Sequence, residues 1–264
     1  MLFNPHQPAR QLAEFIHLYL EGTCDGKPGE YALFPNGFSG IFFNFGKPGI
    51  LSLKQQMRTP KVSIYGQIDR HFMISHDPGF TSIGVLFKPS ALSKLLKLDM
   101  MEFANMAFDG ELIVKELSEL HARMEESADS GTKISLLDSF FTKAMLASDT
   151  TFGVADHALR LMELYRNIPM ENLALKIGVS QRYLEKQFNK VIGLPPKTYS
   201  LIQRFKRIEH ELRVSNSAYW ADLEFANNYY DQNHFIKDFK RFTGRTPSNY
   251  LLEDLDMARS YLVR

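Results

Sequence analysis

The sequence lacks three features, and each absence excludes a class of protein. Cys24 is its only cysteine, which excludes an internal disulfide and is typical of a protein from a reducing compartment. No run of about eighteen apolar residues occurs, so no segment is expected to span a membrane. Residues 1–15 lack the basic start and apolar core of a secretion signal, so the chain is predicted to be cytoplasmic.

Sequence motifs of several enzyme classes are missing as well. There is no Gly-rich phosphate loop, and residues 37–40 lack the spacing of a nucleophile elbow. His71 and His76 lie near Asp77, but without the close His-x-His pair typical of metal-binding barrels, so surface or hydrogen-bonded histidines are the simpler interpretation. We therefore expect no catalytic activity, no cofactor and no metal.

Net charge is close to zero for the whole chain but differs between its halves. The 264 residues include 31 Lys and Arg and 30 Asp and Glu. Residues 1–152 hold 14 basic and 17 acidic residues, whereas residues 153–264 hold 17 and 13. The basic excess of the second half agrees with attraction to phosphate, but it is too small to indicate a nucleic-acid partner by itself.

A twenty-residue pattern occurs twice in the second half. Residues 180–199 and residues 231–250 align without a gap at an offset of fifty-one residues. In each copy a helix-capping residue is followed by apolar residues at i, i+4 and i+7, then by a glycine and a proline. The pattern predicts a capped helix of about three turns, a stop, and a new helix in each copy.

The polar faces of the two predicted helices carry different side chains. The first presents Arg182, Glu185, Lys186 and Asn189, and the second presents Asn233, Ile236, Lys237 and Lys240. Arg, Lys and Asn hydrogen-bond base edges in the major groove. A solvated face is the simpler interpretation of one such helix. Two copies with one scaffold and different outward residues instead favour two helices that recognise different DNA sequences.

The segment before the first copy completes a helix-turn-helix. Residues 173–177 are mostly apolar and end at Gly178, two residues before Ser180. From residue 154 to 252 the chain resembles the DNA-binding domain of the AraC/XylS family of bacterial transcription regulators, which has two helix-turn-helix motifs joined by a long helix. Residues 196–214 are expected to form that helix. The second motif departs from the family at Glu224, where a small residue is usual, and at Asn228, where glycine is usual.

The resemblance implies a role for individual residues. Base contacts are implied for Arg182, Glu185, Lys186, Gln232, Asn233, His234 and Lys237. Phosphate contacts are expected from Lys190, Lys197, Arg204, Lys240 and Arg241, with Lys206 and Arg207 as further candidates on the long helix. The helix-turn-helix scaffold is expected to consist of Ala174, Gly178, Ser180, Phe188, Gly193, Asn228, Asp231, Phe239, Gly244 and Pro247. The two recognition helices would enter successive major grooves about 34 Å apart.

The sequence pattern of the first half is typical of an antiparallel β-domain. Residues 9–21 have apolar residues at helical spacing and predict a short helix. Short apolar runs then follow, separated by Gly/Pro turns, at 31–34, 40–45, 49–53, 62–66, 71–75 and 81–87. These runs predict a small sandwich or barrel, and the motifs around residues 34–46, 65–67 and 84–89 resemble the N-terminal sensor domain of one branch of the same family. That resemblance implies a cupin-like β-barrel followed by helices.

Two features of the first half leave alternatives open. Its many aromatic residues would either fill the barrel core or line a pocket for an apolar ligand. Helices are predicted at 90–98, 111–126 and 134–146, and the apolar stripe of the last would pack on the barrel or form a homodimer. The resemblance implies a small-molecule effector or a dimer contact for this half.

The fold prediction is therefore an α+β chain of two domains. A β-barrel sensor or dimerisation domain with a helical end would span residues 1–147, followed by a linker at 148–153. An all-α domain with two helix-turn-helix motifs would span 154–257, with a tail at 258–264. The predicted function is sequence-specific regulation of transcription, with double-stranded DNA and, for an activator, RNA polymerase as partners. The alternative is a small-molecule-binding or metal-dependent barrel whose DNA-binding domain is degenerate.

Overall fold

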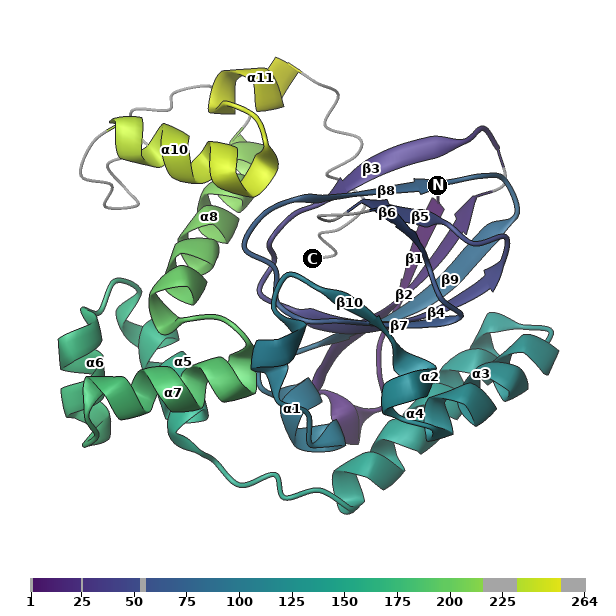
Figure 1. Cartoon of the computed structure of the whole chain (residues 1–264), viewed down its shortest axis with the longest axis horizontal. Coiled ribbons are helices and arrows are strands. Elements are labelled where there is room, and N and C mark those ends of the chain that lie inside the picture. The colour runs from purple at the N-terminus through teal and green to yellow at the C-terminus, as the bar shows by residue number, and fades with distance from the viewer. Residues whose placement is uncertain (1, 25, 53–55, 216–231, 253–264) are drawn as a thin grey trace.

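The protein is described here by a computed structural model that covers residues 2–24, 26–52, 56–215 and 232–252. A β-rich part made from the first 110 residues lies beside two groups of helices, and more helices cover one side of the β-rich part (Figure 1). No helix in these ranges has the length and hydropathy of a bilayer-spanning segment. The predicted order of an antiparallel β-domain followed by helices is confirmed.

Two antiparallel sheets form the β-rich part, which we call the barrel. The six-stranded sheet has the order β1 (Leu2–His6), β2 (Ile16–Cys24), β9 (Phe80–Phe87), β4 (Ser39–Gly46), β7 (Val62–Tyr65) and β10 (Ala107–Asp109). The four-stranded sheet has the order β3 (Gly29–Leu33), β8 (Phe72–His76), β5 (Ile50–Ser52) and β6 (Gln56–Arg58). Leu51 and Phe72 of the smaller sheet pack against Tyr65 of the larger one, so the two sheets share an apolar interior.

The helix predicted over residues 9–21 is wrong. Residues Arg10–Leu12 form one turn of 3-10 helix, and from Ile16 the chain is strand β2. β2 pairs with β1 on one edge and with β9 on the other. A short apolar run fits both periodicities, and here sheet pairing on both edges decides in favour of the strand.

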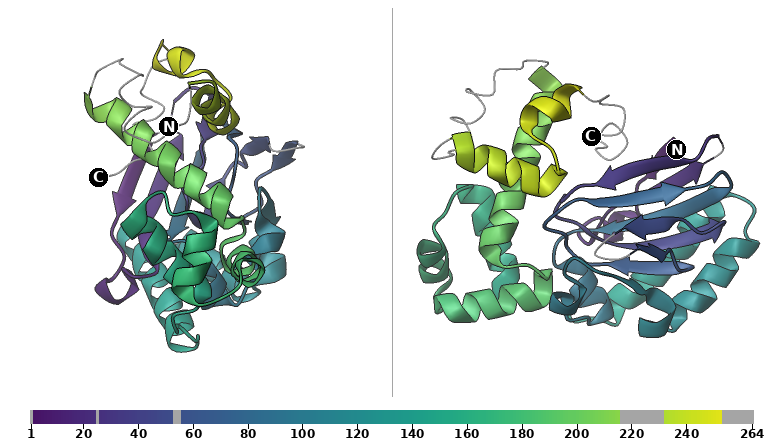
Figure 2. Two further views of the ribbon diagram at one scale, coloured as in Figure 1. Left: turned by 90° about the vertical axis from the view of Figure 1, so that its left-hand side faces the viewer. Right: turned by 45° about the horizontal axis from the view of Figure 1, so that its top comes forward.

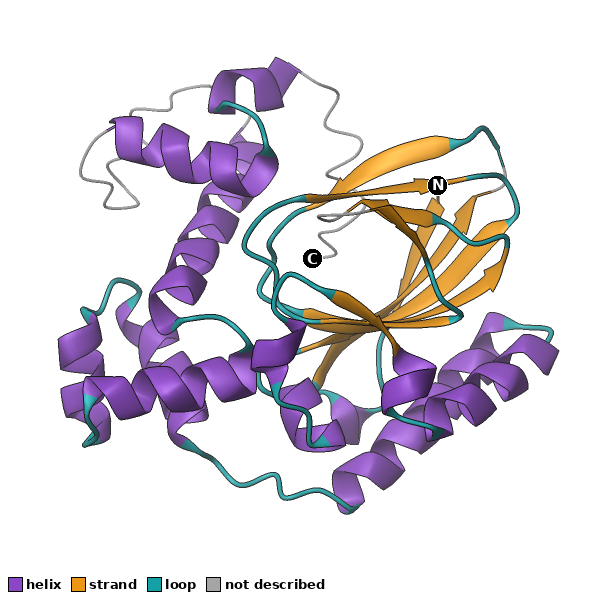
Figure 3. Cartoon of the chain, viewed as in Figure 1, coloured by secondary structure: helices purple, strands orange, loops and turns teal. Residues whose placement is uncertain are grey.

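Helices cover the outer face of the six-stranded sheet (Figure 3). They are α1 (Ala91–Leu96), a 3-10 turn at Met100–Phe103, α2 (Gly110–Ile113), α3 (Glu116–Glu126) and α4 (Ser130–Leu146). The helix predicted over 111–126 is thus two helices. In α4, Leu137 and Phe141 are fully buried against the barrel, and Asp138 accepts a hydrogen bond of 2.8 Å from the Tyr19 hydroxyl. The inner part of the apolar stripe predicted for this helix therefore packs on the barrel of the same chain.

The C-terminal helices form two groups joined by one long helix. They are α5 (Val154–Tyr165), α6 (Met170–Ile177), α7 (Gln181–Ile192), α8 (Pro196–Ser215), α10 (Gln232–Thr243) and α11 (Pro247–Leu252). Helices α5, α6 and α7 share one apolar core with the start of α8. Helices α10 and α11 share a second core with the middle of α8. Figure 2 shows α8 running between the two groups beside the barrel.

Candidate nucleic-acid interface

The first helix-turn-helix is formed by α6 and α7. Gly178 has φ of 79° and ends α6, and the Ser180 hydroxyl then accepts a hydrogen bond of 3.3 Å from the amide of Tyr183. Ala174 is buried against the inner face of α7, where Phe188 is also buried. These contacts hold α7 by one apolar side and leave its other side exposed.

The exposed side of α7 carries the predicted base-contacting residues. Arg182, Glu185 and Lys186 are all exposed. The Gln181 side-chain amide donates a 3.0 Å hydrogen bond to Glu185, which restrains that carboxylate along the helix. Tyr183 is also exposed, by 47%, and sequence analysis missed it. Its position in the first turn of α7, directly after Arg182, was the available signal.

The second recognition helix is α10. Phe235, Phe239 and Phe242 are buried against α8, where Phe205 contacts two of them edge-on or at a tilt. Asn233 and Lys237 are exposed on the other side. Gln232 and His234 lie in the first turn of α10, but their side chains are outside the described part of the structure. Glu224, Asn228 and Asp231 are outside it altogether.

Each recognition helix ends against the barrel side of the molecule at the same point of the repeat. Gly193 follows α7 with φ of 93°, and a Cβ added there would lie 2.6 Å from the Met100 carbonyl oxygen. Gly244 follows α10 with φ of 76°, and its added Cβ would lie 2.5 Å from the His71 ring. Pro247 then begins α11. Only glycine fits both the left-handed backbone and the close approach.

The residues predicted to contact phosphates differ in their exposure and in the contacts that they make within the protein. Lys190, Lys197 and Lys240 are exposed. Arg241 forms an ion pair of 2.6 Å with Asp69 of the barrel, and Arg204 donates a 3.3 Å hydrogen bond to Asn167. In this conformation Arg204 and Arg241 are thus engaged inside the protein.

Asp69 is the barrel residue that holds the second recognition helix. Burial alone would raise the pKa of its carboxyl, but hydrogen bonds from the Arg70 and Arg241 guanidinium groups hold that pKa below its usual value. The ion pair to Arg241 therefore persists across the neutral range. Sequence analysis missed this contact because the two residues are 172 positions apart.

A second buried carboxylate joins the first helix group to the barrel side. Asp156 of α5 accepts hydrogen bonds of 2.7 Å from the Ser90 hydroxyl and 2.8 Å from the Gly153 amide. It also forms an ion pair of 2.8 Å with Lys94 of α1. Asp156 is only 7% exposed, so these partners compensate for the loss of its hydration.

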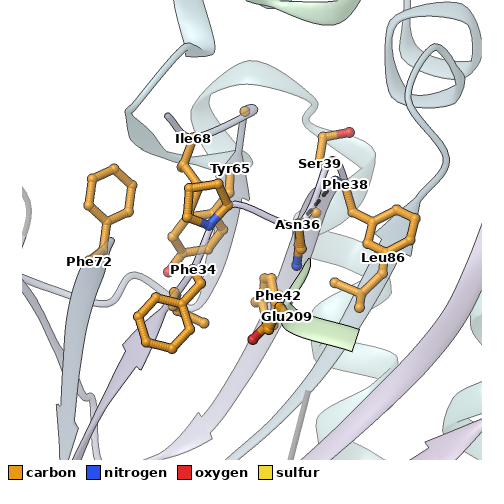
Figure 4. A pocket seen from close by; sticks show the side chains of 14 residues that line it. Phe34, Asn36, Phe38, Ser39, Phe42, Tyr65, Ile68, Phe72, Leu86 and Glu209 are labelled. Carbon is orange, nitrogen blue, oxygen red and sulfur yellow. Dashed lines mark hydrogen bonds between the residues drawn. The ribbon is translucent and has the colours of Figure 1, made fainter. Parts of the chain in front are cut away.

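A cavity of about 70 Å³ lies at the mouth of the barrel (Figure 4). Its wall is mostly aromatic and aliphatic, with Phe34, Phe42 and Phe72 among the lining residues. Glu209 of α8 also lines it, and the Glu209 carboxylate accepts a hydrogen bond of 3.0 Å from the Tyr250 hydroxyl of α11. We call it the barrel-mouth cavity. It thus touches a side chain that is hydrogen-bonded to α11.

The two histidines considered as metal ligands lie in different surroundings. The His71 ring packs against Gly244, whereas the His76 ring stacks on Phe80 and contacts Tyr31, each at 4.5 Å between ring centroids. Within the described ranges, no group of three or more His, Cys, Asp or Glu side chains is arranged to hold a metal ion.

Two segments of the chain match known protein families. Residues 4–109 match a domain of unknown function, DUF6597, and residues 173–253 match a family of helix-turn-helix domains of the AraC type. The chain is 28% identical over 91 residues to the HTH-type transcriptional activator AarP of Providencia stuartii, across 34% of this chain and 67% of AarP. It is 34% identical over 83 residues to the F1 operon positive regulatory protein of Yersinia pestis, across 31% of this chain and 27% of that protein.

A solved structure shares the arrangement of most of the chain. A crystal structure of an apo variant of ToxT from Vibrio cholerae matches 89% of this chain and 97% of its own, with a TM-score of 0.50 and 15% identity. At that identity the likeness shows the two-domain fold alone. The family match and the two relatives instead place residues 173–253 among the AraC-type helix-turn-helix domains of DNA-binding transcription regulators.

Proposed function

We propose that α7 and α10 enter successive major grooves of one DNA site and read different bases. The observation that carries this proposal is the common construction of the two helices. Each has one side buried against α8 or its neighbours and one exposed polar side, fifty-one residues apart in sequence. Arg182, Glu185 and Lys186 would contact bases from α7, and Asn233 and Lys237 from α10, with Gln232 and His234 as further candidates.

The exposed lysines would position the protein without specifying sequence. Lys190, Lys197 and Lys240 would contact phosphates, which makes binding depend on salt concentration. Arg204 and Arg241 would join them only after leaving their partners inside the protein. Residues 154–257 would serve as the DNA-binding domain and residues 1–147 as the sensor or dimerisation domain.

Selection of DNA sites by the full chain from a random pool tests this function. Two enriched motifs centred about ten base pairs apart are expected, because that spacing places both helices on one face of the duplex. Salt-sensitive binding without any enriched motif would contradict sequence-specific recognition. One matched relative is named a transcriptional activator and the other a positive regulatory protein, so we also propose activation of transcription through contact with RNA polymerase.

The barrel-mouth cavity is the proposed effector site. Its apolar wall suits a small aromatic or aliphatic molecule, and the Glu209 carboxylate at its edge disfavours an anionic one. A ligand there would act on the Glu209–Tyr250 hydrogen bond and so on α11. Ile68→Trp, which fills the cavity, is expected to abolish any thermal stabilisation by the effector and leave unliganded DNA binding intact; retained stabilisation would exclude this site.

We propose that the chain acts by binding and carries out no catalysis. The alternative metal-dependent barrel would require His71 and His76 to share a site, yet their rings contact different partners. Metal analysis of the purified protein decides between the two. A stoichiometric transition metal that is lost in His76→Phe would favour the enzyme.

A further inference from the structure

The two faces of the six-stranded sheet carry different kinds of side chain. The face under the helices carries large apolar residues, such as Ile41 and Phe43, which are fully buried. The face inside the barrel carries small or polar residues on the same strands, and the cavities there are lined by Gly40, Asn44 and Ser82 among others. Side chains alternate between the two faces of a strand, so this pattern fills the core under the helices and leaves space inside the barrel.

Phe42 also faces the inside of the barrel, but its ring lies close to the backbone of the sheet. Gly84 is the partner of Phe42 in the register of β4 and β9, and a Cβ added at Gly84 would overlap the ring. A Cβ added at Gly40 would lie 2.8 Å from the same ring. The two glycines thus allow the ring to rest on the sheet, which keeps the space above it open.

Two neighbouring cavities lie in this space. The barrel-mouth cavity measures about 70 Å³, and a second one, which we call the inner cavity, measures about 30 Å³. Leu33, Phe42 and Tyr65 line both of them, so one molecule placed beside these residues can reach into each. An apolar cavity of about 150 Å³ holds one benzene ring, so these two together have room for no more than one small ring.

His76 contributes a buried polar side chain without a partner to the inner cavity. It is 4% exposed, and within the described ranges neither ring nitrogen has a hydrogen-bond partner. Two other polar residues that line the inner cavity are already engaged. The Asn44 amide donates a 2.7 Å hydrogen bond to the Pro60 carbonyl, and the Thr59 hydroxyl accepts one of 3.0 Å from the Gly49 amide. A bound molecule with a hydrogen-bonding group would satisfy the His76 ring.

We propose that the barrel binds a small phenol whose hydroxyl group is recognised by His76. This inference rests on the proposed effector site in the barrel-mouth cavity and names the chemical class of its ligand. The aromatic ring would lie against Phe42, Tyr65 and Phe72, which are among the residues that line the barrel-mouth cavity (Figure 4). From there the hydroxyl group would reach into the inner cavity, because Phe42 and Tyr65 line that one as well.

A hydroxyl group suits His76 better than a carboxylate does. Burial lowers the pKa of His76 to about 4, so at pH 7 one ring nitrogen donates a hydrogen bond and the other accepts one. A hydroxyl group can both donate and accept, whereas a carboxylate only accepts. A carboxylate would also bring a negative charge beside a neutral ring and near the Glu209 carboxylate at the barrel mouth.

Calorimetric titration of the full chain with 4-ethylphenol and with 4-ethyltoluene tests the proposal, because these probes differ only in a hydroxyl or a methyl group. The wild type should bind 4-ethylphenol at least tenfold more tightly. His76→Phe keeps an aromatic ring but loses both nitrogens, so this preference should fall to about threefold or less, while His76→Gln should retain part of it. His121→Phe is the matched control and should keep the wild-type preference. His121 is also buried and stacked on a phenylalanine, but it lies on the helix-covered side of the sheet.

Gly84→Ala gives a second, independent test of the same site. The added methyl group lifts the Phe42 ring off the sheet into the space for the ligand, so both probes should bind at least tenfold more weakly, with circular dichroism showing that the variant folds. Equal binding of the two probes by the wild type, or an unchanged preference in His76→Phe, would overturn the role of His76 and leave the effector site in place. Absence of saturable binding of either probe would overturn both. These titrations contain no DNA, so the proposal for the recognition helices is tested separately.

Discussion

At the scale of single residues, burial sets the chemistry of the histidines. His76 is 4% exposed, and neither ring nitrogen has a hydrogen-bond partner within the described ranges. Burial lowers its pKa from 6.5 to about 4, so its ring is neutral at pH 7. A neutral ring between Phe80 and Tyr31 serves the core as an aromatic side chain. The sequence shows a histidine beside a carboxylate but gives no indication of this stacking.

The pKa of His76 predicts how stability depends on pH. Because the folded pKa lies below the unfolded one, the unfolded chain takes up the proton first as pH falls. The contribution of neutral His76 to the free energy of unfolding is therefore fully present above pH 6.5. It is lost progressively towards pH 4, by up to about 3 kcal/mol. His76→Phe should lose less stability over this interval than the wild type in urea unfolding. His210→Phe, on an exposed part of α8, is the control, and equal losses in all three proteins would contradict the assignment.

At the scale of secondary-structure elements, local signals predicted six strands (β3, β4, β5, β7, β8 and β9) and the first recognition helix, and they failed at β2. The Ser180 cap, the apolar stripe of α7 and the glycine that follows are all local, and the helix lies where they predict. Strand β2 was mistaken for a helix because its neighbours, β1 and β9, decide its structure. β9 is more than fifty residues away from it in sequence, and no window around residue 16 contains that partner.

Substitution of two glycines distinguishes two contributions to the free energy of unfolding. One is the cost of a left-handed backbone, and the other is the cost of a close contact with the barrel side. Gly178 and Gly193 both have positive φ. A Cβ added at Gly178 would have no atom within 4 Å, whereas one added at Gly193 would lie 2.6 Å from the Met100 carbonyl oxygen. Gly178→Ala should cost about 1 kcal/mol of unfolding free energy, and Gly193→Ala about 1–3 kcal/mol more. Chemical denaturation measures both. Equal costs would mean that α7 can move away from Met100 without loss.

At the scale of the whole molecule, the barrel side holds both recognition helices at equivalent ends. Gly193 approaches Met100, Gly244 approaches His71, and Arg241 is paired with Asp69. The two-domain organisation and the exposed faces of α7 and α10 were predictable, because the repeat, the helix caps and the apolar stripes can each be recognised within a short stretch of sequence. The contacts between the barrel side and these helices were not, since each joins residues more than sixty positions apart. The prediction that Arg241 contacts phosphate therefore did not include its ion pair with Asp69.

The Asp69–Arg241 ion pair is expected to restrain DNA binding. Asp69→Asn removes the charge that holds Arg241, so the guanidinium becomes available to phosphate and DNA affinity should rise about threefold to tenfold. Its effect on stability should be small, about 1 kcal/mol or less, because Arg241 is 41% exposed. Asp77→Asn, at a carboxylate outside this contact, is the control for removing one negative charge. Equal gains in both variants would assign the effect to net charge.

Footprinting of the full chain on its selected site tests the central claim, that two separate helices read one DNA face. The wild type should protect two patches about ten base pairs apart. Arg182→Ala should weaken specific binding by about 1–3 kcal/mol and lose base preference in one patch only, while Lys237→Ala does so in the other. A single protected patch, or an equal loss in both patches from either variant, would contradict the account.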